Sequence, residues 1–204
     1  MVRLYFVNTS HEIGAVSPLE LFDRWLTEAE QAEPNDPNAA ALATATPEGA
    51  PNVRIVLVKR VMADRFCFFT NAESRKGREL EANRRAALCF HWKSLRRQVR
   101  VEGAVHELEA PMVDAYFHSR SRASQIGAAI SDQSRILESR EELEERVRRF
   151  TELTPGEVPR PSCWRGFRVL PTRIEFWISG ADRLHDRFLF TRRGEGWEQV
   201  RLFP

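Results

Sequence analysis

The chain has 204 residues, of which 42% are hydrophobic and 29% are charged, and this composition excludes an intrinsically disordered protein. Its 31 basic and 29 acidic residues leave a formal net charge of +2, which excludes the uniformly basic surface of a typical nucleic-acid-binding domain. No apolar run reaches the ~20 residues of a membrane-spanning helix, and the N-terminus lacks a signal-peptide core, so we expect a cytoplasmic protein.

The N-terminal half predicts a helix followed by strands, within a single domain over residues 1–204 whose first 16 residues form a flexible segment. Ser17-Pro18-Leu19-Glu20 has the residue types of a capping box, and apolar residues then recur at helical spacing to about residue 32. Expected strands at 40–46 and 52–59 flank a Pro/Gly turn and predict a hairpin. A strand at 65–70 leads into a short helix from about Ser74, and 86–92 and 98–107 form a second strand pair.

The C-terminal half predicts helices and then strands again. Helices are expected from 110 to about 129, and Ser139 begins another with a second capping box. Strands are expected at 166–169, 173–178, 187–192 and 197–202, with Gly194 and Gly196 in the turn of the last hairpin. Because strands outnumber helices and do not alternate with them, we expect a mostly β protein with peripheral α-helices (α+β), an antiparallel barrel rather than a doubly wound parallel sheet.

Common catalytic and metal-binding motifs are absent from the sequence. There is no GxGxxG, Walker P-loop, HExxH or GxSxG pattern, and Cys67, Cys89 and Cys163 lack CxxC spacing, so no metal site is expected. Four clusters of cations and hydroxyl groups remain, and each of them is suited to binding an anion.

The first two clusters place basic residues beside strands. Arg54 and Lys59 bracket an apolar strand, and their odd spacing over roughly 17 Å puts them on opposite faces, so they would bind different anions. Arg75 and Lys76 follow Ser74 at the start of a short helix, where free N–H groups favour a phosphate. In both clusters the alternative is a pair of solvated cations without a ligand.

The third cluster lies in the helix expected from residue 110. Tyr116, Arg120 and Ser124 are spaced four residues apart, so they share one face if the helix is continuous. A phenol, a guanidinium and a hydroxyl group are three good donors for one phosphate. A solvated helix face is the alternative interpretation.

The fourth cluster precedes the C-terminal hairpin. Strand alternation would place Arg183, His185 and Arg187 on one face, where three cations repel one another unless an anion binds them. Alternatively, Asp182 and Asp186 neutralise this charge.

Eight short segments between residues 54 and 187 together resemble one protein family, and the resemblance extends from about residue 19 to the C-terminus. They are 54–59, 69–71 with 74–76, 97–99, 116–127, 132–135, 157–159, 174–177 and 183–187. In this order and spacing they are similar to the pyridoxine/pyridoxamine 5′-phosphate oxidase family. The chain departs from the family at Ser121, where many members have proline, and over its first fifteen residues, which do not match the segment that closes over substrate in some members.

The resemblance implies an antiparallel FMN-binding split β-barrel, a homodimer, and FMN sites at the subunit interface. It also implies FMN-dependent oxidation of pyridoxamine or pyridoxine 5′-phosphate to pyridoxal 5′-phosphate, with O2 as electron acceptor and release of H2O2. The partners expected are therefore a phosphorylated pyridine, O2 and a second copy of the chain, without nucleic acid or membrane.

Specific residues follow from the matching positions. The resemblance implies that Arg183 and His185 lie against the pyridine ring as catalytic residues. The substrate set adds four donors to these two: Lys59, Tyr116, Arg120 and Ser124. The cofactor set is Arg54, Ile55, Val56, Leu57, Val58, Lys59, Phe69, Thr70, Arg75, Lys76, Gln98, Gln133, Ser134, Trp177 and Arg187.

The same residues bear on three alternative functions. An FMN-dependent oxidase of another heterocycle, such as a phenazine precursor, would be expected to alter the substrate donors. A flavin-binding or storage protein without turnover could lose Arg183 and His185, and both are present. An RNA-binding scaffold would use the basic pairs at 84–85 and 96–97, which lack a stacking platform.

Overall fold

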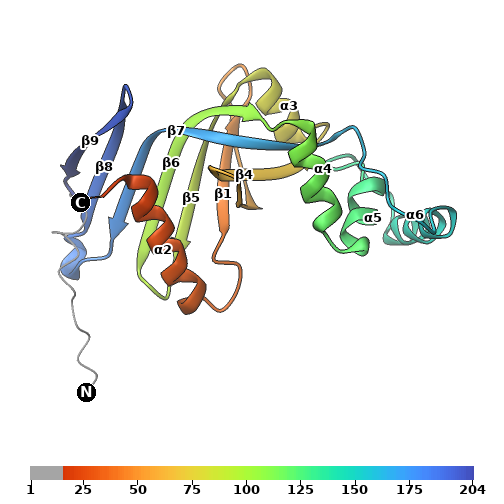
Figure 1. Ribbon diagram of the computed structural model, residues 1–204, viewed down its shortest axis with the longest axis horizontal. Coiled ribbons are helices and arrows are strands. Elements are labelled where there is room, and N and C mark those ends of the chain that lie inside the picture. Colours follow the sequence, from red (N-terminus) through yellow and green to blue (C-terminus); the bar gives the residue numbers. More distant parts are fainter. Residues whose placement is uncertain (1–15) are drawn as a thin grey trace.

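The computed structural model describes residues 16–204, so the expected flexible segment at 1–16 lies, apart from its last residue, outside the described residues. One nine-stranded sheet contains all the described strands (Figure 1). The strands are β1 (Ala39–Ala45), β2 (Pro51–Leu57), β3 (Lys59–Val61), β4 (Asp64–Asn71), β5 (Arg85–Trp92), β6 (Arg97–Glu107), β7 (Trp164–Ile178), β8 (Asp186–Arg193) and β9 (Gly196–Leu202). The helices are α2 (Pro18–Ala32), α3 (Arg75–Ala82), α4 (Ala110–Ser119), α5 (Arg122–Ile130) and α6 (Arg140–Leu153), with a 3-10 turn at Ala181–Arg183.

Strand β7 joins the two halves of the sheet. Along one edge it pairs with β6 from Phe167 to Ile178. Along the other edge its first part pairs with β4 and its last part with β8. The order β2-β1-β5-β6-β7-β4-β3 is antiparallel throughout, and the sheet curls into a half-barrel. This confirms the expected mostly β, antiparallel fold with peripheral helices.

Helix α2 closes the main hydrophobic core. Ser17 caps it with the expected box, in which its side chain accepts from the backbone and Glu20 reaches back to the Ser17 N–H. Phe22 is 1% exposed, and its ring lies 4.7 Å from Phe66 and 5.0 Å from Phe90 between ring centroids. The helix therefore contributes aromatic side chains to the interior of the curled sheet.

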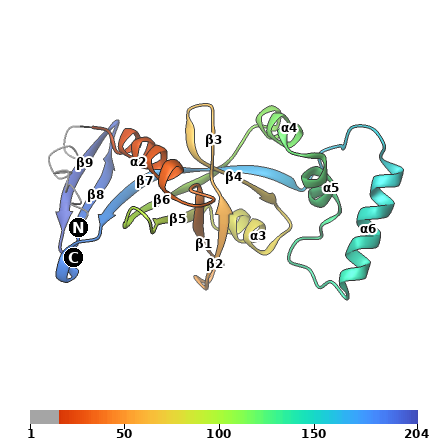
Figure 2. The same cartoon turned by 90° about the horizontal axis from the view of Figure 1, so that it is seen from below.

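A second, smaller core lies under α4 and α5. Its buried members are Cys67, Leu108, Val113, Phe117, Ile126, Val158 and Trp164. It fixes α4 and α5 against the outer end of β4 and the start of β7. In contrast, α6 has no buried residue, and Figure 2 shows it at the far end of the molecule from β8 and β9.

The helical region expected from 110 to about 129 consists of two helices, α4 and α5. Arg120 adopts an extended conformation (φ −77°, ψ 156°) after α4, and Ser121 begins α5 by accepting a hydrogen bond from the Ser124 N–H. A serine N-cap competes with helix continuation because its side chain satisfies free N–H groups. Tyr116, Arg120 and Ser124 therefore do not share the face of one continuous helix.

Other element boundaries also differ from the predictions. The strand expected at 52–59 is interrupted, since β2 ends at Leu57 and β3 begins at Lys59. The two strands expected at 166–169 and 173–178 are one strand, β7, whose pairing shifts register between Glu102 and Gly103 of β6. The expected alternation over 183–187 is absent, because Asp182 (φ 50°) and Arg183 (φ 65°) lie in a left-handed turn before β8.

Among residues 16–204, no helix is long and apolar enough to cross a membrane.

Candidate functional site

A cavity of about 660 Å³ lies where β2, β4, α3, α4 and α5 meet. It gathers cations, hydroxyl groups and aromatic rings from segments that are distant in sequence. Its lining residues are Arg54, Ile55, Val56, Leu57, Phe69, Thr70, Lys76, Tyr116, Arg120, Ser121, Ser124, Gln133 and Trp164. Eleven of these thirteen were predicted as cofactor or substrate residues, the exceptions being Ser121 and Trp164.

Lys76 anchors one side of the cavity. It is the second residue of α3, and its Nζ donates to Thr70 Oγ1 at 3.2 Å and to Gln133 Oε1 at 3.0 Å. Ser74 caps the helix by accepting from the Gly77 N–H. The capped helix start therefore places a cation, and the positive end of α3, next to the end of strand β4.

The charge of Lys76 is not fully compensated. Desolvation, followed by the nearby charge of Arg54, lowers the pKa of Lys76 below its ordinary value, and Glu79 offsets only part of this effect. A bound anion would favour the protonated ammonium group and would raise this pKa again.

Arg120 lines the same cavity. Its guanidinium carbon lies 5.1 Å from the centroid of the Trp164 ring, and desolvation lowers the pKa of Arg120. Its Nη1 is buried and has no hydrogen-bond partner among the described residues. A buried charged donor without an acceptor is costly, so this atom is suited to an anionic ligand.

Three aromatic rings form a stack beside Arg120. Phe69 lies 4.0 Å from Tyr116 and 5.2 Å from Trp164 between centroids, with interplanar angles of 20° and 12°. Desolvation raises the pKa of Tyr116, which keeps its phenol protonated as a hydrogen-bond donor. Ser124, whose hydroxyl contacts Ser121 at 2.9 Å, adds another donor at the rim. The structure thus brings Tyr116, Arg120 and Ser124 into one cavity although the helix between them is broken.

A second group of predicted residues lies across β6, β7 and β8. Gln98 pairs with Trp177, and Trp177 pairs with Arg187, so the three form one row on the same face of the sheet. The His185 ring lies 4.6 Å from that of Trp177, and its Nδ1 accepts from the Gly180 N–H at 3.2 Å. Arg183 is exposed in the preceding turn.

The two groups are separated within one chain. In Figures 1 and 2, the turn before β8 lies at one end of the molecule, and α4 and α5 lie at the other. One copy of the chain therefore does not bring Arg183 and His185 to the cavity that contains Tyr116 and Arg120.

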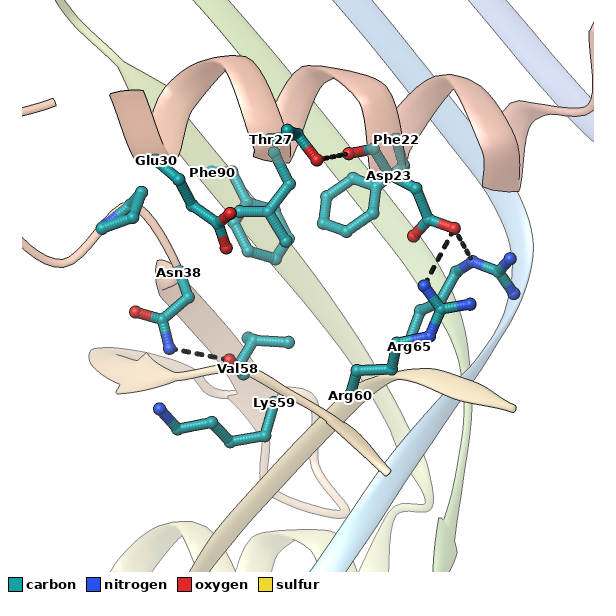
Figure 3. Close-up of a pocket in the computed structure, with 12 residues that line it drawn as sticks. Phe22, Asp23, Thr27, Glu30, Asn38, Val58, Lys59, Arg60, Arg65 and Phe90 are labelled. Atoms are coloured by element: carbon teal, nitrogen blue, oxygen red, sulfur yellow. Dashed lines mark hydrogen bonds and ion pairs between the residues drawn. The ribbon is translucent and has the colours of Figure 1, made fainter. Parts of the chain in front are cut away.

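Lys59 lines a different cavity from the other substrate donors. Figure 3 shows it below α2, near Asn38 and Val58, in a cavity of about 440 Å³. Val58, predicted for the cofactor set, faces the same cavity. Arg54 and Lys59 line different cavities, which agrees with the expectation that they would bind different anions. However, Lys59 does not line the cavity that contains Tyr116.

The remaining predicted residues lie at the edge of the first cavity. Arg75, whose side chain is 60% exposed, is outside its lining, and its Nε donates to Glu79. Ser134 is exposed with a φ of 72°, next to Gln133, which is in the lining.

Two buried carboxylates were missed by the sequence reasoning. Glu79 accepts from Arg54 and Arg75, and Glu175 accepts from Arg187 at 2.8 Å. The spacing of Arg75 and Glu79, four residues apart on a helix, was a signal for the first ion pair. The cross-strand contact of Glu175 depends on register and has no comparable local signal.

The cavity has the chemistry required for a phosphorylated ring compound. Lys76, Arg120 and Arg54 supply positive charge, Tyr116 and Ser124 supply neutral donors, and the stacked rings supply an apolar wall. The unpartnered Arg120 Nη1 shows that the described side chains alone do not satisfy the donors of this cavity.

Two family models match most of the chain. Residues 26–154 match the model described as pyridoxamine 5′-phosphate oxidase. Residues 164–204 match the model described as pyridoxine 5′-phosphate oxidase C-terminal dimerisation region. The first range contains twelve of the thirteen residues that line the cavity, and the second contains the remaining one, Trp164. The second range also contains Trp177, Arg187 and His185.

Individual relatives agree with these models. A pyridoxine/pyridoxamine 5′-phosphate oxidase from Gluconobacter oxydans is 56% identical over 188 residues, covering 92% of this chain and 94% of the relative. One from Rhodospirillum rubrum is 57% identical over 193 residues, covering 92% and 96%. The crystal structure of PhzG from Burkholderia lata, in complex with tetrahydrophenazine-1-carboxylic acid, has a TM-score of 0.90 and 32% identity, covering 100% of this chain and 99% of that one. A pyridoxamine 5′-phosphate oxidase-related, FMN binding protein from Nostoc punctiforme, 15% identical, shares the fold with a TM-score of 0.75, covering 93% and 99%.

Gly77 is required for the close approach of α3 to the end of β4. A Cβ atom at this position would lie 2.2 Å from the Ala72 carbonyl oxygen, a backbone atom that cannot move independently. We expect Gly77→Ala to lower the free energy of unfolding by about 1–3 kcal/mol, although alanine is the better helix former by ~0.5–1 kcal/mol. Urea denaturation measures this change.

Gly127→Ala is the matched control, because Gly127 also lies in a helix and a Cβ there meets nothing within 4 Å. This variant should unfold at an equal or higher urea concentration than the original protein. Equal stabilisation by both substitutions would contradict the packing argument.

Proposed function

We propose that this chain, which belongs to the pyridoxamine 5′-phosphate oxidase family, oxidises pyridoxamine 5′-phosphate and pyridoxine 5′-phosphate to pyridoxal 5′-phosphate, with FMN as cofactor and O2 as electron acceptor. The observation that carries the proposal is the cavity, where cations from three segments surround aromatic rings and the buried Arg120 Nη1 has no acceptor among the described residues. The released product of oxygen reduction is H2O2.

The FMN phosphate is assigned to Arg54, Arg75 and Lys76, which we call the phosphate seat. Lys76 and Arg54 line the cavity, and Arg75 precedes Lys76 at the start of α3. Thr70 and Gln133 hold the Lys76 ammonium group from two sides, and Phe69 and residues 55–57 offer a surface for the flavin. Bound FMN supplies the redox chemistry by accepting hydride from the substrate and passing electrons to O2.

The substrate phosphate is assigned to Tyr116, Arg120 and Ser124. Arg120 provides the charge, and its Nη1 is already desolvated, so little further desolvation accompanies binding. Tyr116 and Ser124 add two neutral donors that fix the orientation of the phosphate. Lys59 is assigned to the same ligand on the family resemblance, which requires its flexible side chain to leave the cavity of Figure 3.

A homodimer completes the site. The lining of the cavity does not include Arg183, His185, Gln98, Trp177 or Arg187. The turn before β8 lies at the other end of the molecule from α4 and α5, so we assign these five residues to a second copy of the chain. The matched dimerisation region, residues 164–204, includes four of these five residues. We assign the whole chain to one domain, since both matched regions contribute strands to one sheet.

The local structure suits Arg183 and His185 to the pyridine ring. Because His185 Nδ1 accepts from the Gly180 N–H, the neutral imidazole carries its proton on Nε2, which is then a donor toward substrate. Arg183 is held by the left-handed turn in an exposed position, where it can contact a ligand in another chain. We assign positioning of C4′ of the substrate to both residues.

A cytoplasmic location is part of the proposal. Cys67, Cys89 and Cys163 are all free thiols, which agrees with a reducing compartment.

One preparation of the purified protein tests the function. We expect it to be yellow, to release FMN on denaturation, and to consume O2 and form H2O2 with pyridoxamine 5′-phosphate. A colourless protein that cannot be reconstituted with FMN would reject the cofactor. A yellow protein that does not oxidise this substrate but oxidises a phenazine precursor would contradict the proposed substrate. It would instead favour an activity on the class of compound bound in the PhzG structure.

Substitution of Arg183 or His185 separates turnover from cofactor binding. Arg183→Ala and His185→Ala should each lower kcat/KM by roughly 10²-fold or more, because a misplaced C4′ is a poor hydride donor. The ratio of FMN to protein after purification should remain near that of the original protein. Arg193→Ala is the control, since Arg193 is exposed and pairs with Glu198. Loss of FMN in the Arg183 and His185 variants would mean that these residues bind the cofactor rather than the substrate.

The lowered pKa of Lys76 predicts a pH-dependent affinity for FMN. In the free protein Lys76 deprotonates below its ordinary pKa of 10.5, so the affinity should fall by ~10-fold or more as the pH rises through this lowered value. Lys76→Arg should remove most of this fall because arginine stays protonated. Fluorescence titration of the apoprotein with FMN between about pH 7 and about pH 10 measures both curves; identical curves would exclude Lys76 as the titrating group.

A further inference from the structure

Glu79 is a buried carboxylate behind the phosphate seat. It lies on the face of α3 that packs against β1, and its side chain is 6% exposed. Its Oε2 accepts from Thr44 Oγ1 at 2.5 Å and from Arg54 Nη2 at 3.2 Å. Its Oε1 accepts from Arg75 Nε at 3.0 Å and from Asn52 Nδ2 at 3.3 Å. One side chain thus connects β1, β2 and α3.

The carboxylate is ionised in this environment. Desolvation raises the pKa of Glu79, but the hydrogen bonds from Thr44, Arg75, Asn52 and Arg54 outweigh it, and the pKa lies below its ordinary value. Its negative charge also raises the pKa of Lys76, opposing the effect of Arg54. Glu79 therefore acts on all three cations of the phosphate seat.

Arg54 is held in one orientation by this arrangement. Its Nη1 donates to the Leu42 carbonyl oxygen and to Thr44 Oγ1, and its Nη2 donates to Glu79. Thr44 Oγ1 accepts a hydrogen bond from Arg54 and donates one to Glu79, so it links the two side chains and helps to fix the orientation of Arg54. A guanidinium fixed in this way loses little further rotamer freedom when it binds an anion.

Arg75 depends on Glu79 more strongly. Its side chain is 60% exposed, and among the described residues its ion pair is with Glu79. Without that contact, a long and solvated side chain would sample many rotamers. The contact therefore keeps a second guanidinium close to the cavity.

We propose that Glu79 is a positioning residue for the phosphate of the flavin nucleotide, because it orients Arg54 from β2 and Arg75 from α3 toward one anion. The inference rests on the proposed function, which assigns the two arginines to FMN. Glu79 itself would not touch the ligand.

Replacement by glutamine has two opposing effects. Removal of a negative charge near the phosphate would by itself strengthen anion binding. However, glutamine offers one acceptor oxygen to four donors and turns an NH2 group toward cations, so at least one guanidinium loses its anchor. The second effect should dominate because Glu79 is buried and its donors cannot all turn to water.

The test compares FMN with riboflavin, which lacks the phosphate. In Glu79→Gln apoprotein we expect the Kd for FMN to rise ~10–100-fold, while the Kd for riboflavin changes by less than ~3-fold. Fluorescence quenching measures both constants. Glu81→Gln is the matched control on the same helix, since Glu81 is exposed and pairs with Arg84; its constants should equal those of the original protein.

Two results would overturn the inference. An equal loss of affinity for FMN and riboflavin would make Glu79 a structural residue only, and tighter FMN binding would make it a repelling charge. If Glu79→Gln does not fold, Thr44→Val, which removes the hydroxyl group that links Arg54 to Glu79, should still lower the preference for FMN over riboflavin by ~3–10-fold; an unchanged preference would also overturn it. An original protein that does not prefer FMN to riboflavin would instead reject the phosphate seat, and with it the proposed function.

Discussion

Repulsion among cations around one cavity is the constraint on which the site depends. Arg54, Lys76 and Arg120 come from β2, α3 and the break between α4 and α5, and all three line the same space. Glu79 compensates Arg54, and the ring of Trp164 lies against Arg120, yet Arg120 Nη1 keeps no acceptor among the described residues and the pKa of Lys76 is lowered. The described side chains thus leave a buried donor in this cavity without an acceptor, and this donor contributes to the electrostatic basis of the proposed ligand binding.

The architecture divides the remaining residues between two places. Strand β7 continues from the β4 half of the sheet into the β8 half, so Trp164 at its start belongs to the cavity and Trp177 near its end belongs to the other group. A strand of fifteen residues has a length of roughly 50 Å at ~3.3 Å per residue, which accounts for the distance between the groups in Figure 1. A site that needs both groups is therefore one that two chains form together.

Three helix starts were predicted correctly from the sequence, whereas contacts between distant residues were not. The capping residues Ser17, Ser74 and Ser139 each begin the helix that was expected, because a cap is a contact within four residues. Tyr116, Arg120 and Ser124 were grouped on the assumption of a continuous helix; they do line one cavity, but for a different reason, since Ser121 ends one helix and starts the next. The extended strand assumed for Arg183 and His185 begins only at Asp186, and Asp182 and Arg183 lie in a left-handed turn that no local apolar pattern had indicated.

The sequence by itself determined the order and type of most elements, the antiparallel sheet and the family resemblance, because these depend on periodicity, turn residues and short motifs that are local in the chain. The tertiary structure alone decided which side chains meet. It placed Lys59 in a different cavity from Tyr116, and it buried Glu79 between two arginines. It also put the turn before β8, which contains His185, at the other end of the molecule from α4 and α5. Such contacts follow from strand register and from the packing of helices on the sheet, and both depend on the whole set of long-range interactions rather than on neighbours in sequence.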